Sequence, residues 1–318
     1  MSVQTLPNRN HLLATIAISG LLSTSAVADT ITVCLDGSCD FTDPAAAAQA
    51  AAEGDVIEIA AGTYLLEAPI SFYGRNAVLR GEVDRAGRPA TILDAQGNGV
   101  VIGCSHTDVT SRFENLQIVN GRSDYGGGLS LSTAASVFQN CVIRDNAAGF
   151  RGGAMHVSLG ASPTFIGCRI VDNIASHPTW NEGWGGAAWL SGDVVLTLVD
   201  SEVRFNAAET SGGGIGMNSD SVVILNNSRI CGNVASDEPG TSQIYGSGTI
   251  TMVFGCIDDS CDCTFDGIDA DLDGDNAVNG ADLGLLLANW GQPGPGDLNG
   301  DDVVGGADLG LMLAAWSK

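Results

Sequence analysis

Gly126-Gly-Gly-Leu129 opens a short apolar stretch that returns three times, as Gly152-Gly-Ala-Met155, Gly185-Gly-Ala-Ala188 and Gly212-Gly-Gly-Ile215. A second repeated stretch alternates with it and begins at Phe113, Phe138, Phe165, Leu198 and Leu225. These starts lie mostly 25 to 27 residues apart, with one longer step from Phe165 to Leu198. A period of this size indicates an array of stacked structural units.

The repeats predict a right-handed parallel β-helix. Short strands separated by Gly and Asn cannot bury an apolar face alone, but they can when they coil one above another. The inward columns are then Leu129, Met155, Ala188, Ile215; Leu131, Val157, Leu190, Met217; and Leu116, Cys141, Cys168, Ser201, Ser228. The outward residues between the first two columns are Ser130, His156, Trp189 and Gly216.

An Asn recurs near the end of the first strand of each unit, at Asn120, Asn146, Asn173, Asn206 and Asn233. We expect these residues and the glycines at the corners, because both types tolerate left-handed backbone conformations. A β-sandwich or a propeller also has short strands, but it lacks a repeated Asn and a Gly pair at fixed offsets. The repeats therefore favour the β-helix.

Ile143-x-x-Asn146-x-Ala148, followed by Gly152-Gly-Ala-Met155, resembles the paired motifs of polymorphic outer-membrane protein repeats. The whole repeat region resembles the pectin-lyase-like β-helix superfamily and covers most of the chain. The resemblance implies a fold and leaves function open, because that superfamily contains lyases, hydrolases, esterases, adhesins and passenger domains.

The N-terminal residues 1–28 are typical of a secretory signal peptide. Arg9 precedes an apolar core from Leu12 to Leu22, and Ala26-Val-Ala28 forms a small-residue cleavage site. We therefore expect a secreted protein, extracellular or at the cell surface. No later apolar run is long enough to span a membrane, and the net charge of −24 argues against nucleic acid as a partner.

Export places the nine cysteines in an oxidising compartment. Cys34 and Cys39 flank a tight turn and are expected to pair. Two of Cys256, Cys261 and Cys263 could close the end of the helix, while Cys141 and Cys168 are expected to be small buried thiols.

The chain divides into four parts by pattern: a signal peptide (1–28), the β-helix (29–255), a Cys-containing linker (256–266) and a C-terminal module (267–318). Pro44 to Ala52 is rich in alanine and predicts a short helix with Asp43 as its N-cap. We expect this helix to cover the open N-terminal end of the β-helix.

Two outward columns carry arginines: Gln117, Val142, Arg169, Glu202, Arg229; and Val119, Arg144, Val171, Arg204, Cys231. Clustered arginines suit the carboxylates of an acidic polysaccharide. The alternative, which the pattern favours, is surface ion pairing of small energetic value.

One turn is longer than its counterparts and runs from Ser176 to Trp184. We predict a glycan face here, with sugar rings stacked on tryptophan and held by polar anchors. Its residues are Trp180, Glu182, Trp184, Trp189 and His156. The alternative is a loop whose tryptophans fold back over the side of the barrel.

The acidic C-terminal segment contains two loops with the spacing of calcium ligands. Positions 1, 3, 5 and 12 carry side-chain oxygens, and position 7 offers a backbone carbonyl. The predicted Ca²⁺ ligands are Asp271, Asp273, Asp275, Ala277 and Asp282, and Asp297, Asn299, Asp301, Val303 and Asp308. Each loop leads into a helical stripe, Leu283, Leu286, Leu287, Trp290 or Leu309, Met312, Leu313, Trp316.

This duplication resembles a type I dockerin module, which implies calcium binding and a cohesin-like protein partner. Two departures stand out. Position 6 is Asn276 or Asp302 in place of Gly, and positions 10 and 11 are Gly-Ala in both loops, where cohesin-binding dockerins usually carry polar residues. Calcium binding is compatible with both departures, whereas the second puts cohesin recognition in doubt.

Two functions follow from these patterns. The favoured one is a non-catalytic β-helix that binds polysaccharide or a surface and docks through the calcium module. The alternative is a polysaccharide lyase or glycoside hydrolase carrying a dockerin. Arg144, Asp145 and Asp172 offer parts of a lyase site, but no motif assigns catalytic residues.

Overall fold

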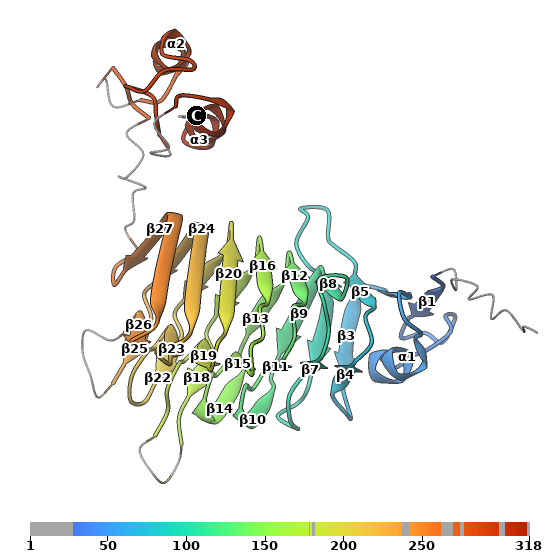
Figure 1. Cartoon of the computed structure of the whole chain (residues 1–318). Coiled ribbons are helices and arrows are strands. Elements are labelled where there is room, and N and C mark those ends of the chain that lie inside the picture. The colour runs from blue at the N-terminus through green and yellow to red at the C-terminus, as the bar shows by residue number, and fades with distance from the viewer. Residues whose placement is uncertain are drawn as a thin grey trace, which may run out of the picture.

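The computed structural model describes residues 28–177, 179, 182–236, 242–261, 270–273, 277–298 and 303–316. The predicted signal peptide lies outside these residues, apart from Ala28. The repeat region forms a parallel β-helix of about eight turns (Figure 1). Within the described residues, no helix is long and apolar enough to cross a membrane.

The strands form three sheets of parallel neighbours. The largest has the order β1 (Thr30–Val33), β2 (Val56–Ile59), β5 (Val78–Gly81), β8 (Arg112–Glu114), β12 (Val137–Gln139), β16 (Thr164–Ile166), β20 (Val195–Val199), β24 (Val222–Cys231), β21 (Glu202–Arg204), β17 (Arg169–Val171), β13 (Val142–Arg144), β9 (Leu116–Val119), β6 (Thr91–Asp94) and β3 (Gly62–Leu65), with β27 (Thr249–Asp258) on β24. The second has the order β10 (Arg122–Tyr125), β14 (Ala147–Arg151), β18 (Ile174–Ala175), β22 (Ala207–Ala208) and β25 (Val234–Ala235). The third has the order β26 (Ile244–Gly246), β23 (Ile215–Met217), β19 (Ala188–Ser191), β15 (Met155–Ser158), β11 (Leu129–Ser132), β7 (Ile102–Ser105) and β4 (Ile70–Tyr73).

The predicted inward columns are confirmed. β11, β15, β19 and β23 pair in register, so that Leu131, Val157, Leu190 and Met217 follow one another along the core, and none is more than 3% exposed. A column of phenylalanines runs beside them. Phe113, Phe138 and Phe165 stack with 4.7 Å between successive ring centroids. Stacking of identical residues on successive turns thus fills this part of the core with closely packed rings.

The repeated Asn residues form a buried ladder. Asn146 Nδ2 donates to Asn173 Oδ1 at 3.0 Å, and the contact recurs from Asn173 to Asn206 and from Asn206 to Asn233 at 2.9 Å. The expected corner role is wrong for these residues. The positive φ falls one residue earlier, at Asp145, Asp172 and Phe205. Asn120 has a positive φ itself and lies outside the ladder, where Gly121 takes the equivalent place.

The two residues of the Gly pair are glycine for different reasons. Gly152 has φ +70°, which favours glycine. The Cα of Gly153 faces the next turn so closely that a Cβ would lie 2.2 Å from the carbonyl oxygen of Gly186. The first glycine therefore permits the turn, and the second permits the close stacking of backbones.

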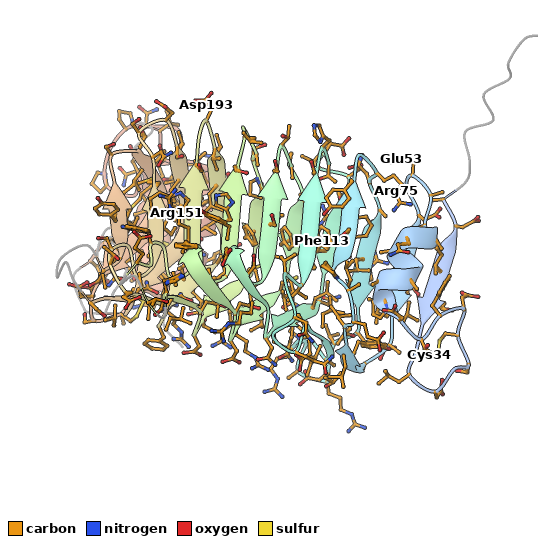
Figure 2. The ribbon with its side chains drawn as sticks, turned by 90° about the horizontal axis from the view of Figure 1, so that it is seen from below. Cys34, Glu53, Arg75, Phe113, Arg151 and Asp193 are labelled. Carbon is orange, nitrogen blue, oxygen red and sulfur yellow. A yellow bond between two sulfur atoms is a disulfide. The ribbon has the colours of Figure 1, made fainter. Side chains whose placement is uncertain are left out.

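Helix α1 (Pro44–Ala50) covers the N-terminal end of the core, as predicted, although it ends two residues before Ala52. Asp43 Oδ1 accepts from the backbone N–H of Ala45 at 2.9 Å. Arg75, labelled in Figure 2, donates to the carbonyls of Ala48 and Ala51 at the opposite end of the helix. A cation at the C-terminal end of a helix also interacts favourably with the helix dipole.

The disulfides close both ends of the β-helix. Cys34 pairs with Cys39, as predicted, and Cys231 pairs with Cys261. Cys256 is also disulfide-bonded. Cys231 is in register with the outward Arg204, as expected, but the disulfide to Cys261 covers it, so that the residue is fully buried. Strand β27 runs to Asp258, so the boundary expected at residue 255 falls inside a strand.

The C-terminal segment contains α2 (Gly280–Ala288) and α3 (Gly306–Ala314). Leu286, Val304 and Met312 form its small buried core. The predicted stripes are only partly buried, since Leu287, Trp290 and Leu313 are 50%, 46% and 55% exposed. The middle of each stripe is buried between the two helices and the described loop residues that pack on them, such as Leu272 and Leu298.

Candidate functional site

The predicted glycan face lies where β10, β14 and β18 turn into the third sheet. Trp180 is outside the described residues. Trp184 and Glu182 are half-buried, and the Glu182 carbonyl accepts from the backbone N–H of His177 at 2.8 Å. His156 and Trp189 are paired in register on β15 and β19, as expected.

Trp189 is not available for stacking on a sugar. It is only 6% exposed. The Arg151 guanidinium lies 4.8 Å from its ring centroid, and on the next turn a Cβ at Gly216 would lie 2.5 Å from the ring. The expectation of an exposed Trp189 is therefore wrong, because the ring lies flat along the helix and is covered by residues of the neighbouring turns. Arg151 is labelled in Figure 2.

A ladder of rings was not anticipated from the sequence. Tyr125 stacks on Phe150 with 5.8 Å between ring centroids, and Phe150 stacks on His177 with 4.6 Å. Phe150 is stacked on both sides, whereas Tyr125 at the end of this row is 47% exposed. His156 lies beside the ladder, 5.5 Å from Tyr125. Its burial and the nearby Arg151 lower the pKa of His156.

A groove lies over the outward faces of β9, β13 and β17. Its cavity has a volume of about 650 Å³. One wall is the loop 84–89, which is held by Gln117 and Asn140. Gln117 Nε2 donates to the Pro89 carbonyl at 2.8 Å, and Asn140 Nδ2 donates to the Gly87 carbonyl at 3.1 Å. Side chains from distant turns thus fix the wall in place.

The groove is lined by guanidinium groups and by carboxylates, among them Asp84, which pairs with Arg88 at 2.7 Å. Arg88, Arg144 and Arg169 line the main cavity, and a second cavity of about 370 Å³ continues from Arg169 to Arg229. We call these two cavities the arginine groove. Arg169 pairs with Glu202 at 2.7 Å, as the predicted column requires, and Arg144 pairs with Asp145. The side chain of Arg229 has no ion pair with any residue that the structure describes.

The second predicted arginine column is only partly at the surface. Val119 and Val171 are 2% and 5% exposed. Both pair in register with Arg144, whose long aliphatic stem lies alongside them. The two arginines of this column differ: the Arg144 side chain is 37% exposed, whereas the Arg204 guanidinium lies 4.9 Å from the Phe205 ring centroid with its Nε buried.

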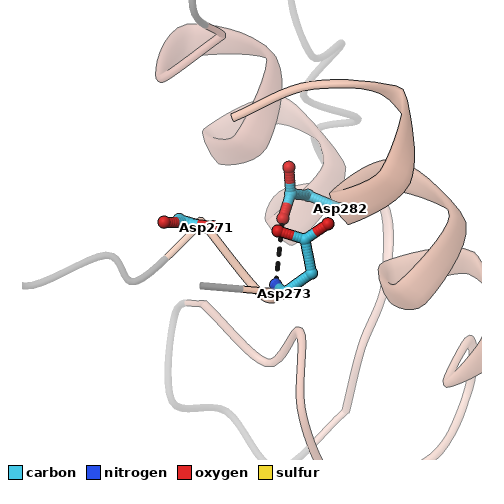
Figure 3. A group of neighbouring side chains, drawn as sticks. All are labelled: Asp271, Asp273 and Asp282. Atoms are coloured by element: carbon cyan, nitrogen blue, oxygen red, sulfur yellow. Dashed lines mark hydrogen bonds between the residues drawn. The ribbon is translucent and has the colours of Figure 1, made fainter. Parts of the chain in front are cut away.

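The first acidic loop brings three carboxylates together. One oxygen from each of Asp271, Asp273 and Asp282 lies within 4.8 Å of the others (Figure 3). Asp282 accepts from the backbone N–H groups of Asn279 at 2.8 Å and Asp273 at 3.2 Å. These bonds, above all the one from Asn279, hold the pKa of Asp282 below its usual range. The Asp275 position is outside the described residues.

The second loop repeats this geometry where it is described. Asp308 is buried and accepts from the backbone N–H groups of Leu298 at 2.7 Å and Gly305 at 2.6 Å. Asn299 and Asp301 are outside the described residues. Calcium binds oxygens at 2.3–2.6 Å, so that ligand atoms lie within about 5 Å of one another. The spacing and chemistry of the first loop fit such an ion.

No protein-family model and no curated protein matches the chain. Its fold is similar to pectate lyase Pel9A (TM-score 0.49, 16% identity, 72% of this chain and 63% of the other). It is also similar to the pectin methylesterases of Aspergillus niger (0.40, 15%, 72% and 87%) and carrot (0.39, 16%, 72% and 84%). The chain thus spans less than two thirds of the pectate lyase, and at these scores the likenesses carry no argument about its chemistry.

Proposed function

We propose that this protein is an exported β-helix that binds acidic polysaccharide along the arginine groove and docks to a protein partner through its calcium module. The observation that carries the proposal is the gathering of cations. Arg88, Arg144, Arg169 and Arg229 line two adjoining cavities in a chain whose net charge is −24. The same cavities are lined by Asp84, Asp172, Asp200 and Glu202, so arginines and carboxylates balance here, whereas the whole chain has 13 basic and 37 acidic residues. This face is therefore enriched in cations relative to the rest of the chain, and an anionic ligand meets less repulsion here.

The ion pairs in the groove leave the arginines usable. Arg169 and Arg144 are 49% and 37% exposed, and pairs of this kind contribute little to stability. A uronate carboxylate can therefore replace Glu202 or Asp145 as the partner of a guanidinium at small cost. Arg229 offers a guanidinium beside Asn227 in the second cavity. Planar guanidinium groups bind carboxylates through two hydrogen bonds, which favours acidic over neutral sugars.

The tryptophan corner stays a secondary proposal. Trp184 is half-buried and Glu182 lies two residues before it, so both can contact the side of a glycan chain. Trp189 offers no free face, and His156 packs against Tyr125. The contacts in this corner are therefore expected to be weaker than those in the groove.

Binding of polygalacturonate and of a neutral galactan, followed by calorimetry, tests the groove. Arg169→Gln and Arg229→Gln should each weaken polygalacturonate binding about 10-fold, because a charge-assisted hydrogen bond is lost. Arg122→Gln removes an exposed cation of β10, outside the groove, and should change little. Equal affinity for the neutral galactan, or equal effects of all three changes, would contradict the proposal.

The alternative function is cleavage of the bound polysaccharide by a lyase or hydrolase reaction. Asp172 favours it, since this exposed carboxylate lines the same cavity as Arg144 and Arg169. Long incubation with polygalacturonate should yield unsaturated or reducing ends if the groove is catalytic. The same incubation with Asp172→Asn and Arg144→Gln shows whether any product arises in the groove.

We propose that each acidic loop holds one Ca²⁺. The ligands are Asp271, Asp273, Asp275, the Ala277 carbonyl and Asp282 in one loop, and Asp297, Asn299, Asp301, the Val303 carbonyl and Asp308 in the other. The ion offsets the repulsion between carboxylates that the loop brings together. A cohesin-like protein is the proposed partner, and the exposed Leu287, Trp290 and Leu313 supply an apolar surface for it.

A further inference from the structure

The last turn of the β-helix exposes residues that belong to its core. β20, β24 and β27 pair in register, so that Leu198, Leu225 and Met252 form one inward column. The first two are fully buried, whereas Met252 is 54% exposed. The neighbouring column ends in the same way, with Ile250 39% exposed after the fully buried Val223. A further turn stacked on β27 would cover these side chains.

The backbone is open at the same place. β27 pairs with β24, and β26 pairs with β23 (Figure 1). Among the described residues, no strand pairs with the outer edge of residues 249–253. Proteins usually cover or charge such an edge, because it is a template for another strand. Here Val253, at the bulge where the register with β24 shifts, is 53% exposed, and the edge is uncharged, with Ile250, Met252 and Val253 as its apolar residues.

Charge distinguishes this end from the rest of the surface. Residues 242–257 contain no Asp, Glu, Lys or Arg, although the chain has a net charge of −24. Two copies of such an acidic protein repel one another over most of their surfaces. The uncharged last turn is the face on which a second copy can approach at the lowest electrostatic cost.

The N-terminal end decides the symmetry of such a contact. Helix α1 covers the core there, and its own Ala45, Ala47 and Ala48 are buried against the core. The C-terminal end of one copy therefore cannot stack on the N-terminal end of another to form a fibre. A contact between two C-terminal ends is isologous, and it closes after two copies.

We propose that the protein dimerises through its last turn, with residues 249–253 of β27 paired antiparallel to the same residues of a second copy. Ile250, Met252 and Val253 are then covered by their counterparts. The two-fold contact places each apolar side chain twice in the interface, so that a single substitution acts on both sides. The groove is formed by earlier turns, so this proposal stands apart from glycan binding.

Sedimentation of the mature chain over a range of concentrations tests the dimer. Wild type should change from monomer to dimer as concentration rises, and Met252→Lys should weaken the dimer at least about 100-fold by placing two like charges in the contact. Leu65→Lys, at a residue 61% exposed on β3, is the matched control and should leave the dimer intact. Because Met252 is exposed in the monomer, the thermal melting of the Met252→Lys monomer should match that of wild type.

Repeating the measurement with calcium and with chelator separates this dimer from association through the calcium module. A dimer that Met252→Lys leaves intact, or that chelator abolishes, would overturn the proposal. So would a monomer at every concentration, and slow amide exchange over residues 249–253 in that monomer would show that another part of the same chain covers the edge. Slower exchange there only in the dimer supports the proposal.

Discussion

The β-helix and the C-terminal module differ in what stabilises them. The helix buries column after column, from Ile57 on β2 to Ile230 on β24, and adds the Asn ladder. Among the described residues of the module, the apolar core cluster consists of Leu286, Val304 and Met312, and the first loop gathers three carboxylates. A continuous apolar core stabilises the first by itself, whereas a core this small needs an additional source of stability.

The largest effect is expected from charge in the β-helix core. Leu131→Asp should lower the free energy of unfolding by about 5 kcal/mol or more, since it leaves a cavity and buries a carboxylate. Ser130→Asp, one residue earlier and outward, should change it by less than about 0.5 kcal/mol. Thermal melting by circular dichroism measures both. Similar losses in the two variants would show that the face of β11 is wrongly assigned.

Removal of calcium should unfold the module and leave the helix folded. Each bound ion at 100 times its dissociation constant adds about 2.7 kcal/mol to the module. Chelator should therefore abolish the α2 and α3 signal in circular dichroism and change the fluorescence of Trp290 and Trp316. Asp271→Ala with Asp297→Ala should have the same effect, whereas Asp193→Ala, an exposed acid of the β-helix, should not. Full helix content in chelator would mean that the module is stable without the ion.

The Asn ladder should matter more than its surface equivalents. Asn173 donates to the Val171 carbonyl at 2.8 Å and to Asn206 Oδ1 at 2.9 Å, and it accepts from the Asn146 amide. Asn173→Ala leaves these buried partners unsatisfied and should cost about 2–3 kcal/mol by denaturant melting. Asn218→Ala, at an exposed position, should fall within about 0.5 kcal/mol of wild type. Equal values for the two would show that the ladder adds no stability.

The smallest expected effect is a pH dependence of the stability of the β-helix, which the module does not share. The pKa of His156 lies below its ordinary value of 6.5 because of burial and Arg151. The unfolded chain therefore binds more protons below about pH 6.5, and stability falls as pH decreases from that value, by at most about 1.4 kcal/mol per pH unit. His156→Gln should make the melting temperature depend less on pH between pH 7 and 5, whereas His106→Gln should leave that dependence unchanged. An unchanged slope in His156→Gln would assign the effect to other groups.

The sequence alone determined the fold of the repeat region and much of its register. Residues at equal offsets in successive repeats must stack, so that the inward placement of Leu131, Val157 and Leu190 follows from the period. The N-cap at Asp43 was equally predictable, since a cap depends on local contacts. Asn120 was wrongly aligned with the Asn ladder by one residue. The pattern shows an Asn near a corner, but it does not show which residue takes the positive φ.

The tertiary structure alone decided which outward residues are accessible. Trp189 and Cys231 occupy outward positions by period, yet Arg151 lies over the first and a disulfide to Cys261 covers the second. The wall of the arginine groove depends on a hydrogen bond between Asn140 and Gly87, which are 53 residues apart. Alternation along a strand assigns a side chain to a face, but its exposure depends on loops and turns that only the folded chain brings together.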